Sequence, residues 1–418
     1  MKQVFGSGAW AYGSLAVVIA SIGTGSPVHA DVADDIVARP RPGYDAQGIP
    51  AGSFRLFPAL TLATSFDDNI DRKEINTLSD VFFTISPSAV LRSQWSQHAL
   101  NLSASSDTLV YSRYSTEDIT NYTLRGDGRL DVLRGFRILG DASYAQLHVV
   151  RSSPDLSANA ESPLPYWQTH ADISAEYQPS DFGISAGVAF DHFDYGSVDL
   201  VGGGIDSWND QNRDVIVPHA RVSYQFSPDY VAYVEGIYDD REFDHAFDRS
   251  GLARSSRGYR VRGGLSAPLS HLLQGGIFLG YLDQRFAAPL PDVSGLDFGA
   301  NLDWYVTQLT TVRVAAARVV NDTTFDGASA MDDESVRISV DHELLRNLVL
   351  HGIVSYTDSR FHGIARDDEI IDAGFGADYF LNPYLSVGAK YTHQSRDSNI
   401  TSQSFSDNLF SIGITGHL

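Results

Sequence analysis

Three sets of side chains in this sequence could do chemistry: an acidic run, a serine near a tight turn, and charged residues at every second position. The acidic run Asp67–Asp71 places oxygen ligands at alternate positions, as the start of a calcium loop does. Arg72 stands where that loop needs its turn glycine, and Leu78 where it needs a bidentate glutamate. We therefore expect a solvated acidic rim and no metal site, with a looser calcium site here or in Asp239–Asp244 as the alternative.

Catalytic chemistry has weak support. Ser266, within Gly264–Pro268, is the closest candidate nucleophile, but the second glycine of a nucleophile elbow is missing. The 13 histidines are dispersed without the HExxH spacing of zinc enzymes, and Gly202–Gly204 lacks the lysine that follows in a phosphate-binding loop. The chain contains no cysteine, so thiol nucleophiles and thiolate metal sites are excluded. We predict that the protein is not an enzyme and needs no cofactor.

The charged residues at alternate positions indicate the passage of polar solutes instead. Successive side chains of a strand point to opposite faces, so in Leu296–Val306 one face is apolar and the other carries Asp297 and Asp303. A channel wall with charges of both signs would set up a transverse field that suits hydrated polar solutes. The residues predicted to line such a pore are Arg125, Asp127, Arg129, Asp131, Asp172, Glu176, Arg221, Arg260, Arg262, Asp297, Asp303, Arg313, Arg337, Asp341, Glu343, Asp372, Asp378 and Lys390.

Histidines and aromatic residues could contribute to the same lumen. His170, His219 and His351 alternate onto the charged face, like ordinary pore-lining polar groups. Tyr166, Trp167 and Trp208 lie in or near long loops and could stack on sugar rings, or pack within their own loops.

The elements that position these residues are strands of ten to fifteen residues, repeated from Phe54 to Leu418. Tight turns alternate with long polar connections, which distinguishes the pattern from a soluble β-sandwich and is typical of outer-membrane barrels. The tight turns fall at Gln94–Gln97, Leu133–Phe136, Gln178–Phe182, Phe226–Tyr230, Pro268–Leu272, Val306–Thr310, Leu344–Leu348 and Phe380–Leu385. The sequence predicts an all-β, transmembrane, antiparallel up-and-down barrel of about 18 strands, with about 16 as the alternative, short periplasmic turns and long extracellular loops.

Tyrosines near the strand ends are expected to form the aromatic girdles of this barrel. The outward face of Tyr230–Tyr238 carries a tyrosine at each end of an apolar band. Tyr281, Tyr356, Tyr379 and Tyr391 are assigned to the outer girdle on other strands.

The chain is expected to divide into a signal peptide at residues 1–30, a periplasmic Pro/Gly-rich segment at 31–53 and the barrel at 54–418. Ala9–Gly23 is the long apolar stretch, and Val28–Ala30 resembles a small-residue cleavage site. Residues 31–53 could plug the lower mouth, contact a periplasmic partner or form a loosely held leader. A net charge of −22 argues against nucleic-acid binding.

A Pro/Gly-rich block runs through Arg39–Asp45, Gly48–Phe54 and Leu56–Pro58 and is followed by Phe66–Ile70. This block resembles the opening of an outer-membrane β-barrel porin family of α-proteobacteria, whose members are often associated with exopolysaccharide or capsule export. The later strands match that family only in pattern. The resemblance implies a barrel in the cell outer membrane and, more weakly, a polymer as cargo.

We therefore expect an outer-membrane channel for polar solutes or polymer, as a component of a polysaccharide export system. A general diffusion porin is the alternative, favoured if long loops fold inside and constrict the lumen. A membrane-embedded hydrolase or a plugged surface scaffold would be a different class of protein. The expected partners are outer-membrane lipid and lipopolysaccharide, the barrel assembly machinery and periplasmic polysaccharide-export components.

Overall fold

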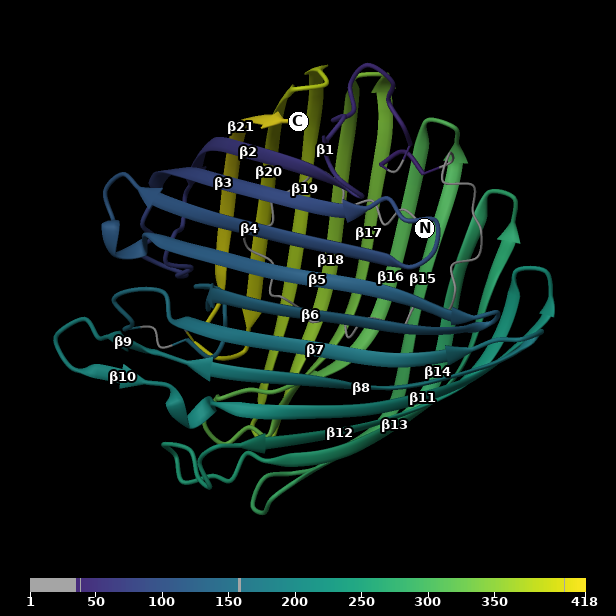
Figure 1. The fold of residues 1–418 in the computed structure, drawn as a ribbon. Coiled ribbons are helices and arrows are strands. Elements are labelled where there is room, and N and C mark those ends of the chain that lie inside the picture. The colour runs from purple at the N-terminus through teal and green to yellow at the C-terminus, as the bar shows by residue number, and fades with distance from the viewer. Residues whose placement is uncertain (1–34, 38, 157–158, 402) are drawn as a thin grey trace.

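The computed structural model describes residues 35–37, 39–156, 159–401 and 403–418. These residues form an antiparallel sheet of 19 strands, in which β1 is a three-residue strand paired with the start of β2. The other 18 strands close into a barrel through pairing of β2 with β21 (Figure 1). This confirms the predicted barrel of about 18 strands. In the described part of the chain, no helix is long and apolar enough to cross a membrane.

Each barrel strand is 12 to 17 residues long and pairs with the next barrel strand along the chain, apart from the closing pair. The strands are β2 (Phe54–Asp67), β3 (Asp80–Ser93), β4 (Ala99–Tyr111), β5 (Ile119–Leu133), β6 (Phe136–His148), β7 (Pro165–Tyr177), β8 (Phe182–Tyr195), β11 (Arg213–Ser227), β12 (Tyr230–Phe243), β13 (Ser256–Ser270), β14 (Leu273–Phe286), β15 (Val293–Thr307), β16 (Thr310–Asn321), β17 (Ala330–Leu345), β18 (Leu348–His362), β19 (Arg366–Asn382), β20 (Leu385–Ser398) and β21 (Phe405–His417). Shorter elements are β1 (Ile49–Ala51), the loop hairpin β9 (Ser197–Asp199) and β10 (Ile205–Ser207), and the 3-10 turns η1 (Ser115–Glu117) and η2 (Asn209–Gln211).

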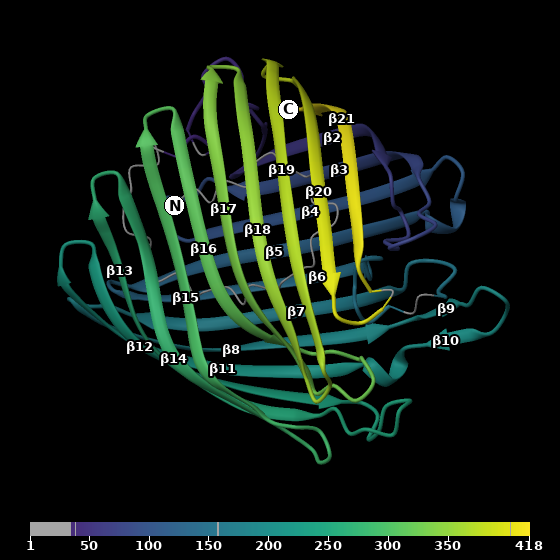
Figure 2. The same cartoon turned by 180° about the vertical axis from the view of Figure 1, so that it is seen from behind.

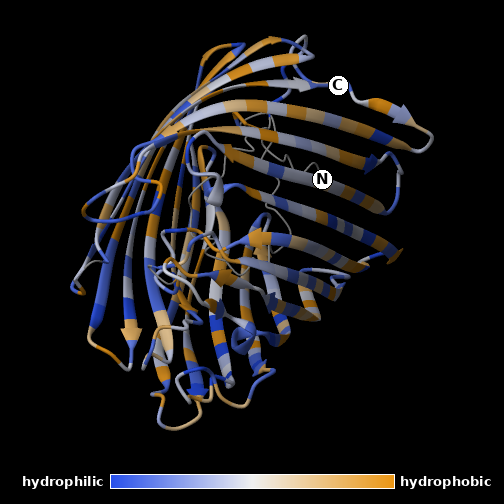
Figure 3. Ribbon diagram, turned by 90° about the vertical axis from the view of Figure 1, so that its left-hand side faces the viewer, coloured by the Kyte–Doolittle hydropathy of each residue, from blue (hydrophilic) through white to orange (hydrophobic). Residues whose placement is uncertain are grey.

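The alternation of the sequence appears as two faces of the sheet. In β15, Leu296 and Trp304 are 56% and 48% exposed, whereas Asp297 between them is fully buried. Apolar and polar bands accordingly alternate along the strands (Figure 3). Because an isolated barrel in water would expose this apolar face at a large cost, the outer surface is suited to hydrocarbon and the inner one to water.

The connections separate the two ends of the barrel. At one end the strands are joined by tight turns, such as Arg134–Gly135 between β5 and β6. Gly135 has φ of +78°, and a Cβ there would lie 2.7 Å from the carbonyl oxygen of Gln178, so this turn requires glycine. The described ends of the chain, at β1 and β21, lie at the same end, which is the periplasmic one.

The longer connections lie at the opposite, extracellular end (Figures 1 and 2). The largest joins β8 to β11 and contains the β9–β10 hairpin, which projects from the barrel rim (Figure 1). Further connections at this end are loop 149–164, between β6 and β7, loop 244–255, between β12 and β13, and loop 322–329, between β16 and β17.

Tyrosines mark both ends of the apolar band, with one correction to the sequence prediction. Tyr238 and Tyr259 are cross-strand partners on the extracellular side, and Tyr259 contacts the ring of Tyr281. Tyr379, however, pairs with Leu348 near the periplasmic end. The assignment of Tyr379 to the outer girdle was wrong because β19 runs from the extracellular end towards the periplasm.

Hydroxyl pairs and one arginine close the seam between the first and last barrel strands. The Oγ1 atoms of Thr61 and Thr415 are 2.8 Å apart, as are the Oγ atoms of Ser65 and Ser411. At the extracellular end of this seam, Arg72 contacts Asp67 of β2 at 3.0 Å and Asp407 of β21 at 3.1 Å.

The segment before β1 is held against the inner wall at the periplasmic mouth. Asp35 forms an ion pair with Arg313 of β16, and Arg346 donates to the carbonyl oxygen of Pro40 at 2.7 Å. Ile36 is fully buried, and the guanidinium of Arg41 lies 5.3 Å from the centre of the Phe380 ring. The predicted signal peptide at residues 1–30 lies outside the described residues.

Candidate channel lumen

The residues predicted to line a pore all lie on the inner face of the barrel. Each occupies the strand parity opposite to the exposed apolar side chains, as Arg260 and Arg262 do beside the exposed Val261. That these residues line a conducting path remains a prediction. Their surroundings differ strongly from one wall to another, and the differences decide which charges a solute could meet.

On β11–β13 and β15, arginines and carboxylates form a buried network that we call the arginine lattice. Its members are Arg213, Arg221, Glu235, Asp239, Arg241, Arg260, Arg262, Asp297 and Asp322. Arg262 is central, with Nε 2.6 Å from Asp297 and Nη1 3.7 Å from Glu235. Glu235 also accepts from Arg221 at 2.8 Å. Every charge of this wall therefore has an opposite charge beside it.

The lattice continues to the extracellular rim. Arg241 contacts Asp239 at 2.8 Å and Asp322 at 2.6 Å, and Asp322 also pairs with Arg213 at 2.9 Å. Asp322 belongs to loop 322–329, and the two arginines hold its pKa below the usual range despite burial, which acts in the opposite direction. The lattice therefore ties this loop, as an anion, to the barrel wall.

Aromatic rings lie against the guanidinium groups of the lattice arginines. The guanidinium of Arg221 lies 4.1 Å from the centre of the Tyr233 ring, that of Arg262 4.4 Å from Phe278, and that of Arg213 4.3 Å from Phe193. Stacking of this kind suits the planar, weakly hydrated guanidinium better than an ammonium group. The near absence of lysine from the sequence, which has arginine at nearly all its basic positions, fits this architecture.

A second wall, on β5–β8 and β11, carries charges that stay accessible, and we call it the open acid wall. Its members are Asp127, Asp141, His170, Asp172, Asp191 and His219. Asp141 pairs directly with Asp127 on one side and with Asp172 on the other. Like charges opposite each other destabilise a sheet, so this row of carboxylates is not there for stability.

Imidazoles, amides and Arg125 are the partners of these carboxylates. Nδ1 of His170 lies 2.9 Å from Asp191 and its Nε2 3.6 Å from Asp141, while Nδ1 of His219 lies 4.0 Å from Asp172. The side chains of Asp141 and His170 are each 28% exposed, against 0% for Asp297 in the lattice. Asp141 and Asp191 were not among the residues predicted to line the pore, although both alternate with apolar residues in the sequence and could have been found by that signal.

A third group lies near the periplasmic mouth, where the strand wall meets the N-terminal segment. Arg313 lies between Asp341, Asp303 at 3.8 Å and the carboxylate of Asp35. His351 in turn contacts Asp341 at 2.5 Å and Asp378 at 3.2 Å. The structure thus brings four of the predicted residues together with Asp35, whose role the sequence did not indicate.

The remaining predicted residues have partners of other kinds. Arg129 and Asp131 form an ion pair at 3.1 Å, and Asp372 accepts from Ser355 and Gln394 at 3.1 and 2.8 Å. Further ion pairs join Arg125 to Asp141, Glu176 to Arg137 and Glu343 to Arg39. Arg337 is exposed on the inner face of β17, and Lys390 is half-buried on that of β20.

Two loops meet inside the extracellular half of the barrel. Asp155 of loop 149–164 accepts hydrogen bonds from the hydroxyl of Thr323 at 2.6 Å and from the backbone N–H of Thr324 at 3.0 Å. The carbonyl oxygen of Ser152 accepts from Arg396, on the inner face of β20, at 2.8 Å. Since β6 and β16 lie nearly opposite each other in the closed strand order, these contacts form a loop bridge across the lumen.

Two arginines, the buried Arg254 and the partly buried Arg151, fix the two parts of the loop bridge. Arg254, of loop 244–255, donates to the carbonyl oxygens of Thr323 and Ala328. Arg151 holds loop 149–164 to Glu117 at 2.5 Å. Burial raises the pKa of Asp155, which the hydrogen bonds from Thr323 and Thr324 and the charge of Arg366 oppose. The bridge therefore carries a titratable group at its centre.

The loop aromatics pack within the protein. Trp208 is buried in a cluster with Leu164 and Val198, below the guanidinium of Arg249 at 5.1 Å. The rings of Tyr166 and Tyr195 stack in a nearly parallel arrangement, with a centroid distance of 5.3 Å. These contacts favour the packing alternative over sugar stacking for Trp208 and Tyr166.

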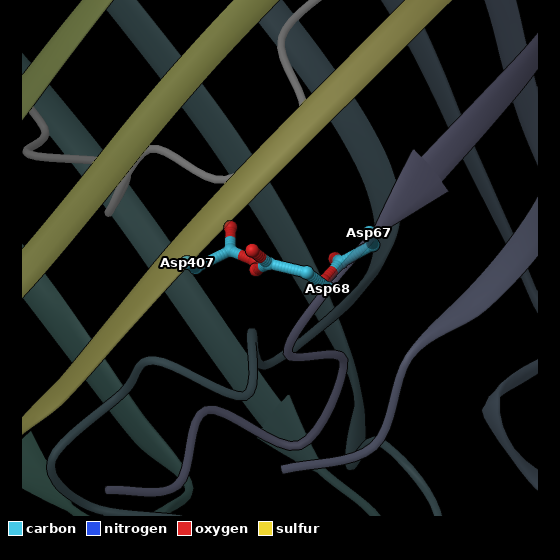
Figure 4. Close-up of side chains that lie close together, drawn as sticks. All are labelled: Asp67, Asp68 and Asp407. Carbon is cyan, nitrogen blue, oxygen red and sulfur yellow. The ribbon is translucent and has the colours of Figure 1, made fainter.

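The acidic run does not present an open cation site. Asp67, Asp68 and Asp407 gather at the end of β2 and could offer oxygens within 4.8 Å of one another (Figure 4). The guanidinium of Arg72 already lies against Asp67 and Asp407, and Asp68 accepts from Asn408 at 2.7 and 2.8 Å. The cluster therefore acts as a clamp of the barrel seam.

The candidate nucleophile lies in a strand rather than at an elbow. Ser266 is part of β13 and pairs with Val231 on one side and Gly276 on the other. Neither neighbour can act as a general base or as its orienting acid.

One family model and several solved structures are similar to this chain. The model of a family described as "Putative beta-barrel porin 2" matches residues 41–418. No curated protein matches the sequence significantly. Solved structures with a similar fold include Pseudomonas aeruginosa OpdK with vanillate, at 11% identity and a TM-score of 0.47 over 87% of this chain and 99% of that one. OccK2 (OpdF) of the same organism, in complex with glucuronate, has 12% identity and a TM-score of 0.47 over 89% and 100%.

Proposed function

This chain belongs to the family described as "Putative beta-barrel porin 2", and from that premise we propose that it is a diffusion channel for small hydrated solutes. The barrel is porin-like and its place is the outer membrane. An 18-strand barrel is wide enough to hold an aqueous lumen, whereas an eight-stranded one is filled by side chains. Whether small solutes alone can pass depends on what narrows that lumen.

The loop bridge is the observation that carries the proposal. Asp155 meets Thr323 and Thr324 from the opposite side of the barrel, so any solute has to pass beside this crossing. A bridge held by hydrogen bonds narrows the path, and the residues that the structure describes include no folded plug domain beside it. Long loops that fold inside and constrict the lumen are the feature expected of a general diffusion porin.

The open acid wall gives the proposed channel a preference among solutes. Asp127, Asp141 and Asp172 form an accessible row of negative charge, in which Arg125 pairs with Asp141 at 3.4 Å, whereas the arginines of the lattice are paired and largely buried. We expect cations to be favoured over anions, because a ring or row of carboxylates raises the local cation concentration.

Polysaccharide export stays a prediction that rests on the resemblance of the N-terminal block alone. An extended polymer would have to pass the same loop bridge, so export requires that the bridge opens when a periplasmic component engages the N-terminal segment.

The hydrolase alternative requires turnover of an acyl ester that is lost in Ser266→Ala; an inactive parent protein would contradict it.

Planar-bilayer recordings on the refolded chain without residues 1–30 test the proposal. We expect a steady conductance that increases in Asp155→Ala, because the loss of two hydrogen bonds releases the bridge. Asp326→Ala, in the same loop 322–329 but outside the Asp155 contact, is the matched control and should conduct as the parent does. A parent protein that is silent, and stays silent in Asp155→Ala, would sink the open-channel proposal.

A further inference from the structure

Two arginines face each other directly on the outside of the barrel. Arg257 of β13 and Arg285 of β14 are cross-strand partners, with side chains 70% and 71% exposed. Such partners have Cβ atoms about 4.5–5.5 Å apart, a distance at which like charges destabilise a sheet. The position therefore favours an anion that lies between the two guanidinium groups.

Neighbouring tyrosines show on which face of the sheet the two arginines lie and how far they stand from the membrane centre. Arg257 and Arg285 share the strand parity of Tyr259 and Tyr281, which are exposed on the outer face. Along the strands, the pair Arg257–Arg285 comes two residues beyond Tyr259, about 6.6 Å closer to the extracellular rim. Because interfacial tyrosines lie at the boundary of the hydrocarbon, the arginines stand at the level of the lipid headgroups.

The two arginines lie in a pocket in which their aspartate partners use only some of the guanidinium N–H donors. Its volume is about 580 Å³, and its lining includes Tyr238, Asp240, Arg257, Tyr259, Asp283 and Arg285. Asp240 lies 3.1 Å from Nε of Arg257, and Asp283 lies 3.2 Å from Nε and 2.9 Å from Nη2 of Arg285. Each guanidinium has five N–H donors, so these contacts orient the two groups without using them up.

We propose that this pocket binds the phosphate group of an outer-leaflet lipid headgroup between Arg257 and Arg285. A phosphate accepts bidentate hydrogen bonds from a guanidinium, and its charge offsets the repulsion between the two arginines. The tyrosine rings below would lie against the upper part of the lipid, where apolar and wet surfaces meet. The site is independent of the lumen and so does not depend on the proposed channel function.

Another outer-face arginine of the barrel provides a matched control. Arg360 of β18 is 57% exposed on the same surface, but its cross-strand partners are Asp332 and Asp367. Arg360 has one ion pair, with Asp358 at 2.5 Å, as Arg257 and Arg285 have with their own aspartates, but no second arginine faces it across the strands. Arg360→Gln therefore removes an exposed arginine from the outer face, near the extracellular end of β18, without removing the proposed site.

The experiment measures lipid retained per barrel by native mass spectrometry of the full-length protein in detergent. The probes are diphosphorylated lipid A, lipid A with its phosphates removed, and inorganic phosphate. We expect the parent protein to prefer the phosphorylated lipid, Arg257→Gln/Arg285→Gln to bind it roughly tenfold more weakly, and Arg360→Gln to bind as the parent does. Heat-modifiable gel migration checks that each variant is folded.

Three results would overturn the proposal: equal retention by the double variant, equal retention of the dephosphorylated lipid, or displacement of the lipid by inorganic phosphate at equimolar amounts. The last result would mean a site for the free anion. If the double variant does not fold, the single variants Arg257→Gln and Arg285→Gln should each show a partial loss. Parent-like retention in both would contradict the site.

Discussion

The arginine lattice and the open acid wall are built from the same residue types on the same barrel, yet they differ in what surrounds each charge. In the lattice, Arg262 and Asp297 are buried and 2.6 Å apart, with an aromatic ring below the arginine. On the open acid wall, Asp141 is partly exposed and has carboxylates as both of its cross-strand neighbours.

The difference shows that a list of inward charges does not describe the field inside a barrel. The two members of a buried ion pair neutralise each other. Removing either one lowers the stability of the barrel, because the charge that remains has neither water nor a partner. An accessible carboxylate contributes little to stability but acts on any ion that passes. The two walls should therefore respond to substitution in opposite ways.

The largest effect is expected in the lattice. Asp297→Ala leaves Arg262 buried without its nearest partner and should lower the free energy of unfolding by about 3–5 kcal/mol. Urea unfolding of the refolded barrel, followed by tryptophan fluorescence, measures the change. The double variant Arg262→Met/Asp297→Leu should recover much of the loss, and a stability of Asp297→Ala within about 1 kcal/mol of the parent would refute the lattice as a stabilising network.

A pH effect on the loop bridge comes next. Because burial raises the pKa of Asp155, the docked loop binds a proton more tightly than the released loop. The protonated form stabilises docking fully below the ordinary value of 3.8, and this contribution is lost as pH rises through the raised pKa. Conductance should therefore increase with pH across this range.

Asp155→Asn is the control for this titration. The amide oxygen can still accept from Thr323 and Thr324, so the loop stays docked while the titratable group is gone. Single-channel conductance of the variant should be the same at acidic and neutral pH. An unchanged pH response in Asp155→Asn would assign it to another group.

Neutralising one member of the open acid wall should cost no stability. Asp127→Asn relieves the repulsion from Asp141 and should raise the free energy of unfolding by about 0.2–1 kcal/mol. It should also weaken the cation preference, measured as a smaller reversal potential in a KCl gradient. Arg337→Gln, which removes an exposed cation from the inner face, should change the reversal potential in the opposite direction.

The smallest effect is expected for an exposed ion pair with good geometry. Arg129 and Asp131 are 3.1 Å apart but remain 28% and 36% exposed. Arg129→Gln should change the free energy of unfolding by no more than about 0.5 kcal/mol, and less in high salt. If Arg129→Gln lowered the free energy of unfolding as much as Asp297→Ala does, burial would not explain the difference between the two walls.

Sequence periodicity was sufficient for the barrel, because each strand repeats one local rule: residues such as Leu296 and Asp297 alternate between lipid and lumen. It assigned Asp297 and Arg262 to one face but could not pair them, since they lie on strands β15 and β13, with β14 between them. The meeting of Asp155 with Thr323 was equally out of reach, because it depends on how two irregular loops fold in three dimensions.

The seam between β2 and β21 has a consequence for the order in which the molecule can be built. The hydroxyls of Thr61 and Thr415 are 354 residues apart in the chain, and the Ser65–Ser411 pair spans 346. Contacts of such sequence separation form late, and until then the first and last strands both present unsatisfied edges. The two hydroxyl pairs lie on the lumen face, on the strand parity opposite to the exposed Leu62 and Ile412, and either hydroxyl of a pair can be the donor, so the last contacts of the closing seam can form from the aqueous side of the wall without fixing a donor direction in advance.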